Sequence, residues 1–143
     1  MVSLKTDKIR LTKLSRFKTN GGDVLHAIKE SSDGFDGFGE AYFSWIEPKY
    51  IKAWKCHKRM TMNLVVPIGE VRFVFFDDEN NSYREEIIGE KNYARLTVPS
   101  NVWFGFQGLG SSSSLVLNLA SIEHDPQEVI RSELSHFDFN WSK

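Results

Sequence analysis

Short runs in which apolar and polar residues alternate follow one another along most of the chain. The clearest run spans residues 70–75 and reads Glu-Val-Arg-Phe-Val-Phe. Further runs lie at 40–45, 63–66, 95–98, 102–106 and 114–120. A period of two residues is typical of strands that turn one face toward a core, and these runs are rich in the aromatic and β-branched residues that favour strands. The pattern predicts an all-β protein.

Turn-forming residues separate the runs. Glycine, proline, asparagine, aspartate and serine cluster at 20–22, 33–34, 67–69, 77–82, 99–101 and 108–111. Strands that follow one another at short spacing, with no long helical pattern between them, predict an antiparallel sandwich or barrel. One short helical turn is expected at 126–134, because Asp125 can cap its N-terminus and Pro126 fits the first helical position.

The length, charge, cysteine content and apolar stretches of the chain limit the kinds of function that it can have. A chain of 143 residues has room for one core, so we expect a single domain over residues 1–143. Eighteen lysines and arginines nearly balance nineteen aspartates and glutamates, which argues against nucleic acid or an acidic membrane as a partner. Cys56 is the only cysteine, so an intramolecular disulfide and a structural zinc cluster are excluded. Residues 1–14 lack a signal-peptide core and no stretch has the roughly 20 apolar residues of a membrane span, so we expect a cytoplasmic location.

Two segments of the chain are similar to sugar-nucleotide cupins. Residues 54–58, Trp-Lys-Cys-His-Lys, and the following 63–71 resemble the histidine-bearing strand, turn and return strand of those proteins. Residues 96–106 are similar to their I-P-x-G-x-x-H-G-F strand pair. The chain therefore resembles the RmlC-like cupin family over about residues 22–131. This resemblance implies a double-stranded β-helix, the cupin-like jelly roll, with antiparallel strands.

Two branches of this family match different parts of the sequence. In the dTDP-sugar 3,4-ketoisomerases the motif is H-A-H-K, and here Lys55-Cys56-His57-Lys58 keeps the second histidine and the lysine while Lys55 replaces the first histidine. In the dTDP-4-dehydrorhamnose 3,5-epimerases an F-x-E motif, matched by Phe38 and Glu40, helps to hold the nucleotide base across a dimer interface.

The sequence also departs from the epimerase branch. The histidine of H-G-F is Phe104, and the strand expected to bring a tyrosine acid, residues 115–119, has no tyrosine. Tyr42 or Tyr50 can substitute only if the fold brings one of them into the cavity.

The chemistry of the family gives His57 and Lys55 catalytic roles. Isomerising a 4-keto sugar begins with removal of a proton from the carbon next to the carbonyl, which a neutral imidazole such as His57 can do. Lys55 shares a face with His57 on an expected strand around 52–58 and can stabilise the enolate. The alternatives are a histidine that packs in the barrel mouth and a solvated basic edge strand.

Further residues are candidates for substrate binding through aromatic stacking, charge or polar contacts. They are Phe38, Glu40, Tyr42, Trp54, Lys58, Asn63, Arg72, Trp103 and Asn118. For the tryptophans core packing is the alternative, and for Asn63, Arg72 and Asn118 an internal hydrogen-bond network is equally open.

No metal and no other cofactor are expected. Metal-binding cupins use about three histidines and a carboxylate, whereas His57 stands alone in its motif. The other histidines, at 26, 124 and 136, are expected at the surface or in hydrogen bonds.

These observations lead to one main hypothesis and two alternatives. The main hypothesis is a nucleotide-sugar epimerase or ketoisomerase acting on a 4-keto-6-deoxy sugar nucleotide in bacterial surface polysaccharide synthesis, such as that of the O-antigen of lipopolysaccharide. The alternatives are a non-catalytic cupin module that binds a sugar or sugar nucleotide and a structural or regulatory dimer. A homodimer is implied because the family exchanges N-terminal strands between subunits and because residues 1–14 would offer an unpaired edge.

Overall fold

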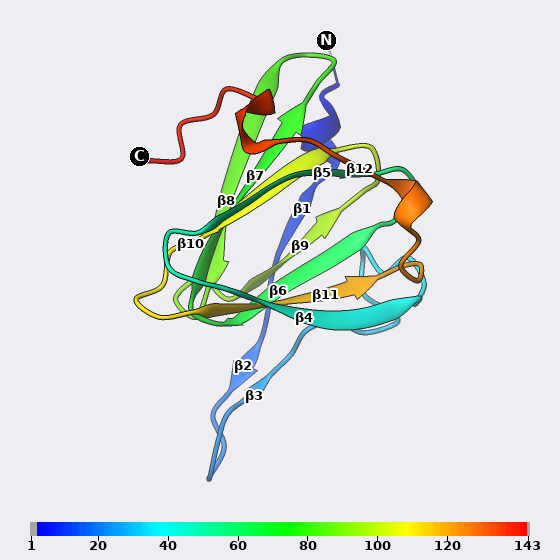
Figure 1. Cartoon of the computed structure of the whole chain (residues 1–143). Helices are drawn as coiled ribbons and strands as arrows, with labels where there is room; N and C mark the ends of the chain where they lie inside the picture. The colour runs from blue at the N-terminus through cyan, green and yellow to red at the C-terminus, as the bar shows by residue number, and fades with distance from the viewer. Residues whose placement is uncertain (1–2, 143) are drawn as a thin grey trace.

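Two five-stranded antiparallel sheets face each other in the computed structural model, which describes residues 3–142 (Figure 1). The first sheet has the order β1 (Arg10–Lys13), β9 (Ala94–Val98), β6 (Met62–Ile68), β11 (Ser114–Ala120), β4 (Glu40–Ile46). The second has the order β12 (Val129–Arg131), β5 (Ile51–His57), β10 (Trp103–Gly108), β7 (Glu70–Asp77), β8 (Ser82–Gly89). A hairpin of β2 (Arg16–Phe17) and β3 (Val24–Leu25) extends away from both sheets, and the 3-10 turns are η1 (Lys5–Lys8), η2 (Pro126–Glu128) and η3 (Leu134–His136).

Apolar side chains at alternate positions of the strands form the core between the two sheets. Every second residue of β6, β7 and β9 is buried there, namely Met62, Leu64, Val66, Val71, Phe73, Phe75, Ala94, Leu96 and Val98. Burying a large apolar side chain contributes roughly 1.5–3 kcal/mol, so this row is the main source of stability. These side chains fill the sandwich on the side of β7 and β9. On the other side, between β4, β5, β10 and β11, a cavity remains.

A second apolar cluster covers the outer face of the second sheet. Trp54, Phe76 and Trp103 lie there beneath Phe137 and Trp141 of the C-terminal segment, residues 133–141, which is red in Figure 1. Trp54 Nε1 donates a hydrogen bond to the Leu134 carbonyl (3.1 Å). This packing holds the C-terminal segment in place and, with it, the short strand β12 on the edge of β5.

The antiparallel all-β prediction and the jelly-roll class are confirmed, with local differences. The alternating runs all form strands, but the sequence analysis missed β8 at 82–89. The helical turn expected at 126–134 ends at Glu128, because residues 129–131 pair with β5 as β12. None of the helices within residues 3–142 is long and apolar enough to cross a membrane.

The N-terminal strand lies at the end of the first sheet. Strand β1 pairs with β9 of the same chain, with Leu11 opposite Leu96, and its other side has no strand partner among residues 3–142. Residues 1–2 of the expected edge lie outside the described residues.

Candidate active site

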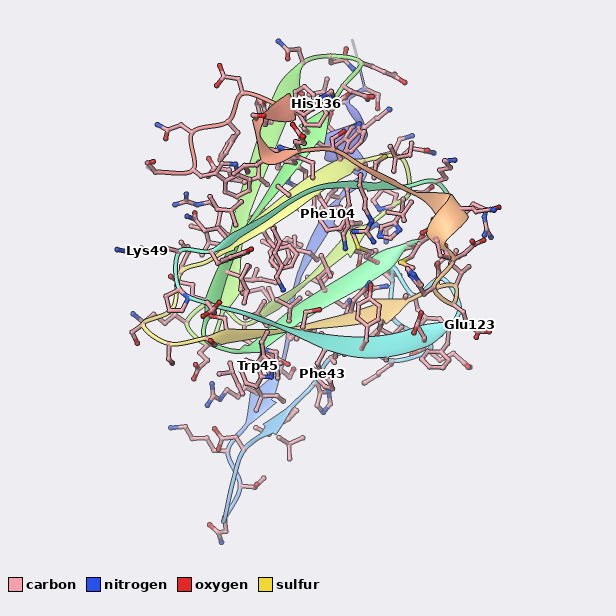
Figure 2. The ribbon with its side chains drawn as sticks, in the orientation of Figure 1. Phe43, Trp45, Lys49, Phe104, Glu123 and His136 are labelled. Carbon is pink, nitrogen blue, oxygen red and sulfur yellow. The ribbon has the colours of Figure 1, made fainter. Side chains whose placement is uncertain are left out.

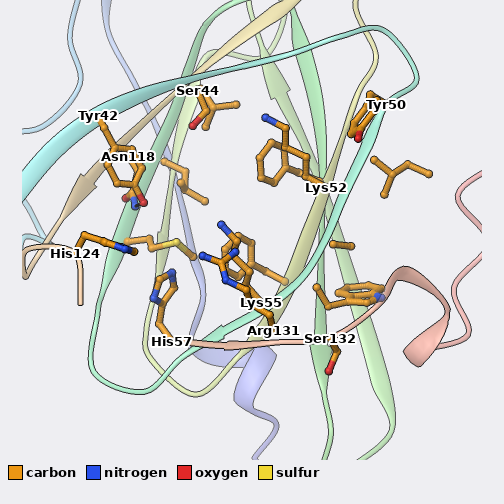
Figure 3. A pocket seen from close by; sticks show the side chains of 18 residues that line it. Tyr42, Ser44, Tyr50, Lys52, Lys55, His57, Asn118, His124, Arg131 and Ser132 are labelled. Atoms are coloured by element: carbon orange, nitrogen blue, oxygen red, sulfur yellow. Dashed lines mark hydrogen bonds between the residues drawn. The ribbon is translucent and has the colours of Figure 1, made fainter. Parts of the chain in front are cut away.

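A cavity of about 640 Å³ opens between the two sheets. Its inner wall is apolar, because Met62, Leu64, Phe104, Phe106 and Val116 point inward from β6, β10 and β11. Its polar groups lie in three places in Figure 3: His57, Tyr42, Asn118 and His124 at one end, Lys55 and Arg131 in the middle, Lys52 and Tyr50 at the other end. A volume of this size is ordinary for a small-molecule site.

His57, at the end of β5, is held in one orientation. Its side chain is 9% exposed, and the ring stacks on Phe104 with a centroid separation of 5.8 Å. Nδ1 forms a hydrogen bond with Oε1 of Glu128. Because Nδ1 is engaged with a carboxylate, Nε2 is the ring nitrogen that is left to act on a ligand.

Glu128, the partner of His57, is a functional candidate that the sequence analysis missed. It is 3% exposed, and its Oε2 accepts hydrogen bonds from the backbone N–H groups of Arg59 (3.1 Å) and Met60 (3.2 Å). Burial by itself raises the pKa of Glu128, but the hydrogen bond from His57 and those from the two backbone groups outweigh it and hold the pKa below its usual value. An ionised carboxylate therefore lies behind the imidazole and fixes its tautomer.

Cations occupy the middle of the cavity. Lys55 lies on the same face of β5 as His57, and β12 places Arg131 opposite it across the strand pair. No carboxylate is among the 18 residues that line the cavity. Burial, followed by the charges of Arg131 and Lys52, lowers the pKa of Lys55. The cavity therefore favours an anionic ligand.

Tyr42 and Asn118 form a polar pair across neighbouring strands. Asn118 on β11 is opposite Tyr42 on β4, and Asn118 Nδ2 donates to the Tyr42 hydroxyl (3.0 Å). Because the hydroxyl oxygen accepts this bond, its own proton is free for a ligand. Both tyrosines that the sequence analysis left open, Tyr42 and Tyr50, line the cavity.

The sequence matches the FdtA family, described as WxcM-like, C-terminal, over residues 7–140. The chain belongs to the FdtA family. The resemblance to RmlC-like cupins is confirmed by this match and by the solved structures that the chain resembles.

Three relatives illustrate the similarity of this FdtA-family chain to known proteins. The solved structure of a dTDP sugar isomerase from Desulfovibrio desulfuricans G20 is 32% identical, covers 99% of this chain and 95% of that chain, and has a TM-score of 0.90. The spore coat polysaccharide biosynthesis protein SpsL of Bacillus subtilis (strain 168) is 22% identical over 95% of this chain and 96% of that protein. The probable low-salt glycan biosynthesis epimerase Agl13 of Haloferax volcanii is 26% identical over 75% of this chain and 73% of that protein. These names support an isomerase or epimerase class for the FdtA-family chain.

Several residues predicted to bind substrate lie away from the cavity of this FdtA-family chain. Arg72 and Trp103 point to the outer face of the second sheet, where Arg72 Nη1 donates to Gln107 Oε1 and to the Trp141 carbonyl, both at 3.3 Å. Asn63 faces the outside of the first sheet and bonds the Gly34 carbonyl (3.0 Å) and Thr97 Oγ1 (2.6 Å). Each side chain is held in an internal network.

The other residues predicted to bind substrate differ in where they lie relative to the cavity. Lys58 is exposed beyond the end of β5, and Phe38 is 64% exposed outside the cavity. Glu40 does not line the cavity, but its carboxylate accepts a hydrogen bond from the backbone N–H of His124. Trp54 contributes to the lining, although its indole packs in the outer aromatic cluster.

His124 was expected at the surface, and the structure places it at the rim of the cavity. Its side chain is exposed, and Figure 3 shows the ring directed toward the end of the cavity that holds His57 and Tyr42. Within residues 3–142, no three histidine, cysteine, aspartate or glutamate side chains are grouped so that they could hold a metal ion.

Proposed function

We propose that this FdtA-family protein is a nucleotide-sugar isomerase that acts on a 4-keto-6-deoxy sugar nucleotide in the synthesis of a surface polysaccharide, with His57 as the base. The relatives named above are a dTDP sugar isomerase and two proteins of polysaccharide or glycan biosynthesis, which supports the substrate class and the pathway. The cytoplasm and O-antigen synthesis stay predictions, which cell fractionation and the glycan profile of a deletion strain would test.

The observation that supports this proposal most strongly is that Glu128 holds His57 from behind while the imidazole lines a cavity that also contains cations. The carboxylate holds the proton on Nδ1, so Nε2 presents a lone pair that can accept a proton from carbon. Removing that proton leaves negative charge on the carbonyl oxygen. Lys55, on the same strand and face, supplies positive charge for this enolate in a cavity with largely apolar walls.

Tyr42 is the best-placed general acid. It projects from the first sheet, whereas His57 projects from the second, so the two groups approach a ligand in the cavity from different sides. Its hydroxyl accepts from Asn118 and can donate its own proton to the carbon or oxygen of an enolate. This arrangement supports Tyr42 in the role of the tyrosine acid that residues 115–119 lack.

Deuterium exchange tests the proposed function directly. The protein is incubated in deuterated water with a dTDP-4-keto-6-deoxy sugar, and loss of the ring proton next to the carbonyl is followed by NMR. We expect exchange by the wild type and a loss of at least 10²-fold in His57→Asn, because the base is removed. His26→Asn is the matched control, since His26 packs against Phe17 and does not line the cavity. If dTDP raises the melting temperature but the wild type exchanges no proton, the protein is a passive binding module instead.

We further propose a homodimer that covers the outer face of the first sheet. Phe43 and Trp45 are 62% and 57% exposed and extend from β4 on the side away from the cavity (Figure 2). They lie opposite Leu117 and Leu115 of β11, so the apolar surface continues over two strands. An exposed apolar patch of this kind favours association with a second copy, as the family resemblance implies.

The oligomeric state tests this interface. Sedimentation of the wild type should give the mass of two chains, and Trp45→Lys should give one chain, because the lysine places a charge in an apolar contact. Lys91→Glu, an exposed substitution outside the patch, is the control. A wild type that sediments as a single chain at high concentration would refute the dimer.

A further inference from the structure

A second cavity lies beside strand β1, which is the blue strand at the edge of the first sheet in Figure 1. It has a volume of about 820 Å³ and is lined by residues 10–15, 26–29, 32–33 and 95. We call it the β1 cleft. Within residues 3–142, no residue lines both this cleft and the cavity that holds His57, so the two are separate places on the molecule.

Arg95 brings a buried positive charge to the wall of the β1 cleft. The residue is 2% exposed, and its Nη1 and Nη2 donate hydrogen bonds to the carbonyls of Ala27 (2.8 Å) and Asp33 (3.0 Å). Within residues 3–142 its Nε has no hydrogen-bond partner, and burial, with no carboxylate to counter it, lowers the pKa of Arg95. Buried charges in proteins are normally paired with an opposite charge. Here two neutral carbonyls are the only hydrogen-bonding partners that the described residues give this guanidinium.

Further cations gather around Arg95. Arg10 lies on the same face of the sheet, because it is opposite the residue two positions further along β9, which makes it a diagonal neighbour at roughly 7–8 Å. Lys13 and Lys29 also line the cleft. Among the lining residues, all within residues 3–142, Asp33 is the only carboxylate. Because like charges repel, this arrangement favours an anion between them.

The other lining groups indicate which kind of anion fits. Thr12, Ser15 and Ser32 supply hydroxyl groups, and the carboxylate of Asp33 can accept hydrogen bonds from a sugar but repels a second phosphate. Within the described part of the chain, no phenylalanine, tyrosine or tryptophan lines the cleft, so a nucleotide base has no such ring to stack on. The volume has room for more than a phosphate ion. A hydroxylated phosphate monoester therefore fits better than a nucleoside diphosphate.

We propose that the β1 cleft is a second binding site, which takes a sugar phosphate. Arg10 and Lys29 hold the phosphate next to the buried charge of Arg95, and Asp33 accepts hydrogen bonds from the sugar hydroxyls. Because Arg10 comes from β1 and Lys29 from the segment that follows the β2–β3 hairpin, a bound phosphate joins these two parts of the chain. This site goes beyond the proposed function and does not depend on a reaction at His57.

Calorimetric titration of the full chain with glucose 1-phosphate tests the site. We expect the wild type to bind it, and Arg10→Met/Lys29→Met to bind it roughly tenfold more weakly or worse, because two charge-assisted hydrogen bonds are lost. Both side chains are exposed, so the fold does not depend on them. Glucose, which has no phosphate, should not bind at the same concentration.

Two double variants serve as controls. Lys8→Met/Lys91→Met also removes two exposed positive charges, but outside the cleft, and should leave the affinity for glucose 1-phosphate unchanged. Lys55→Met/Arg131→Met removes two cations from the cavity that holds His57 and should leave it unchanged as well.

Three results would overturn the inference. They are equal affinity in the wild type and Arg10→Met/Lys29→Met, loss of binding only in Lys55→Met/Arg131→Met, and a wild type that binds no glucose 1-phosphate at millimolar concentration. In the last case, a change in sedimentation of Arg10→Met/Lys29→Met would assign the cleft to a contact between copies of the chain instead. None of these results bears on proton exchange at His57, so the proposed function stands or falls separately.

Discussion

Replacing Glu128 with glutamine changes the chemistry of His57 while leaving its surroundings nearly the same in size. Oε2 of Glu128 accepts two backbone hydrogen bonds, from Arg59 and Met60, so the glutamine oxygen must take that place. Its amide NH₂ group then faces Nδ1 of His57, which cannot also donate a proton to it. The ring therefore adopts the tautomer with hydrogen on Nε2. In that tautomer Nε2 has no lone pair to accept a proton from the substrate.

The expected loss follows from the comparison with other carboxylate–histidine pairs. Forcing the wrong tautomer lowers the rate of proton abstraction by roughly 10²- to 10⁴-fold. The cost to folding is smaller, about 1–3 kcal/mol, because a charged hydrogen-bond acceptor is replaced by a neutral one. The assay is the initial rate of deuterium incorporation into the keto sugar nucleotide, with the dTDP-induced rise in melting temperature measured in parallel.

A matched control separates the tautomer effect from a general effect of the substitution. Glu133→Gln makes the same change at an exposed carboxylate five residues further along the chain. It should leave both exchange and binding unchanged. A folded Glu128→Gln protein that binds dTDP and exchanges at the wild-type rate would refute the role given to Glu128.

Three further substitutions test other parts of the structure. Tyr42→Phe should reduce product formation at least tenfold in the same NMR assay while dTDP still raises the melting temperature, and unchanged turnover would exclude Tyr42 as the acid. Asp77→Asn should cost about 1–3 kcal/mol in urea unfolding at pH 7, because fully buried Asp77 accepts hydrogen bonds from the backbone of Lys5 (2.7 Å), Glu79 (2.9 Å) and Asn80 (3.2 Å). Burial raises the pKa of Asp77, but these bonds outweigh it and lower that pKa, so its contribution is present above the unfolded-state pKa of roughly 3.9 and is lost as the pH falls through the folded-state pKa. The gap between wild type and Asp77→Asn should therefore shrink below about pH 4, and a constant gap would contradict this account. Trp141→Ala should lower the free energy of unfolding by about 3 kcal/mol in the same assay and slow deuterium exchange, because Trp141 packs on Trp54 and holds the C-terminal segment. Exchange at the wild-type rate would show that this segment does not support the site.

The period of two along the strands was enough to predict the sheets and to place His57 and Lys55 on one face. It did not show which face of each strand meets the cavity, because several strands are apolar on both sides. Residues 62–66 of β6 are all buried, so Asn63 is as enclosed as its neighbours although it faces outward. On β7, Arg72 lies between Val71 and Phe73, which face the core, and so it must point to the opposite face.

The position of Glu128 could not be read from local sequence. It is 71 residues away from His57, and no spacing in the sequence connects them. Its approach depends on β12 pairing with β5, in a segment that was expected to be helical. The same strand pairing places Arg131 opposite Lys55. The only local signal was a turn with Asp125 as its cap and Pro126 at its first position, and it was interpreted as the start of a helix.

The order in which the chain is synthesised gives the C-terminal segment a further consequence. A ribosome produces His57 and the strands around it long before Glu128 and Arg131, so a nascent chain can pair β4, β6 and β11 while its base still lacks the carboxylate that orients it. A fragment that stops before residue 125 retains the apolar cavity wall but has an unoriented imidazole and one cation fewer. If His57 acts as proposed, proton abstraction requires the chain as far as Arg131, and we expect a tag at the carboxyl end to disturb it more than one placed near the β2–β3 hairpin.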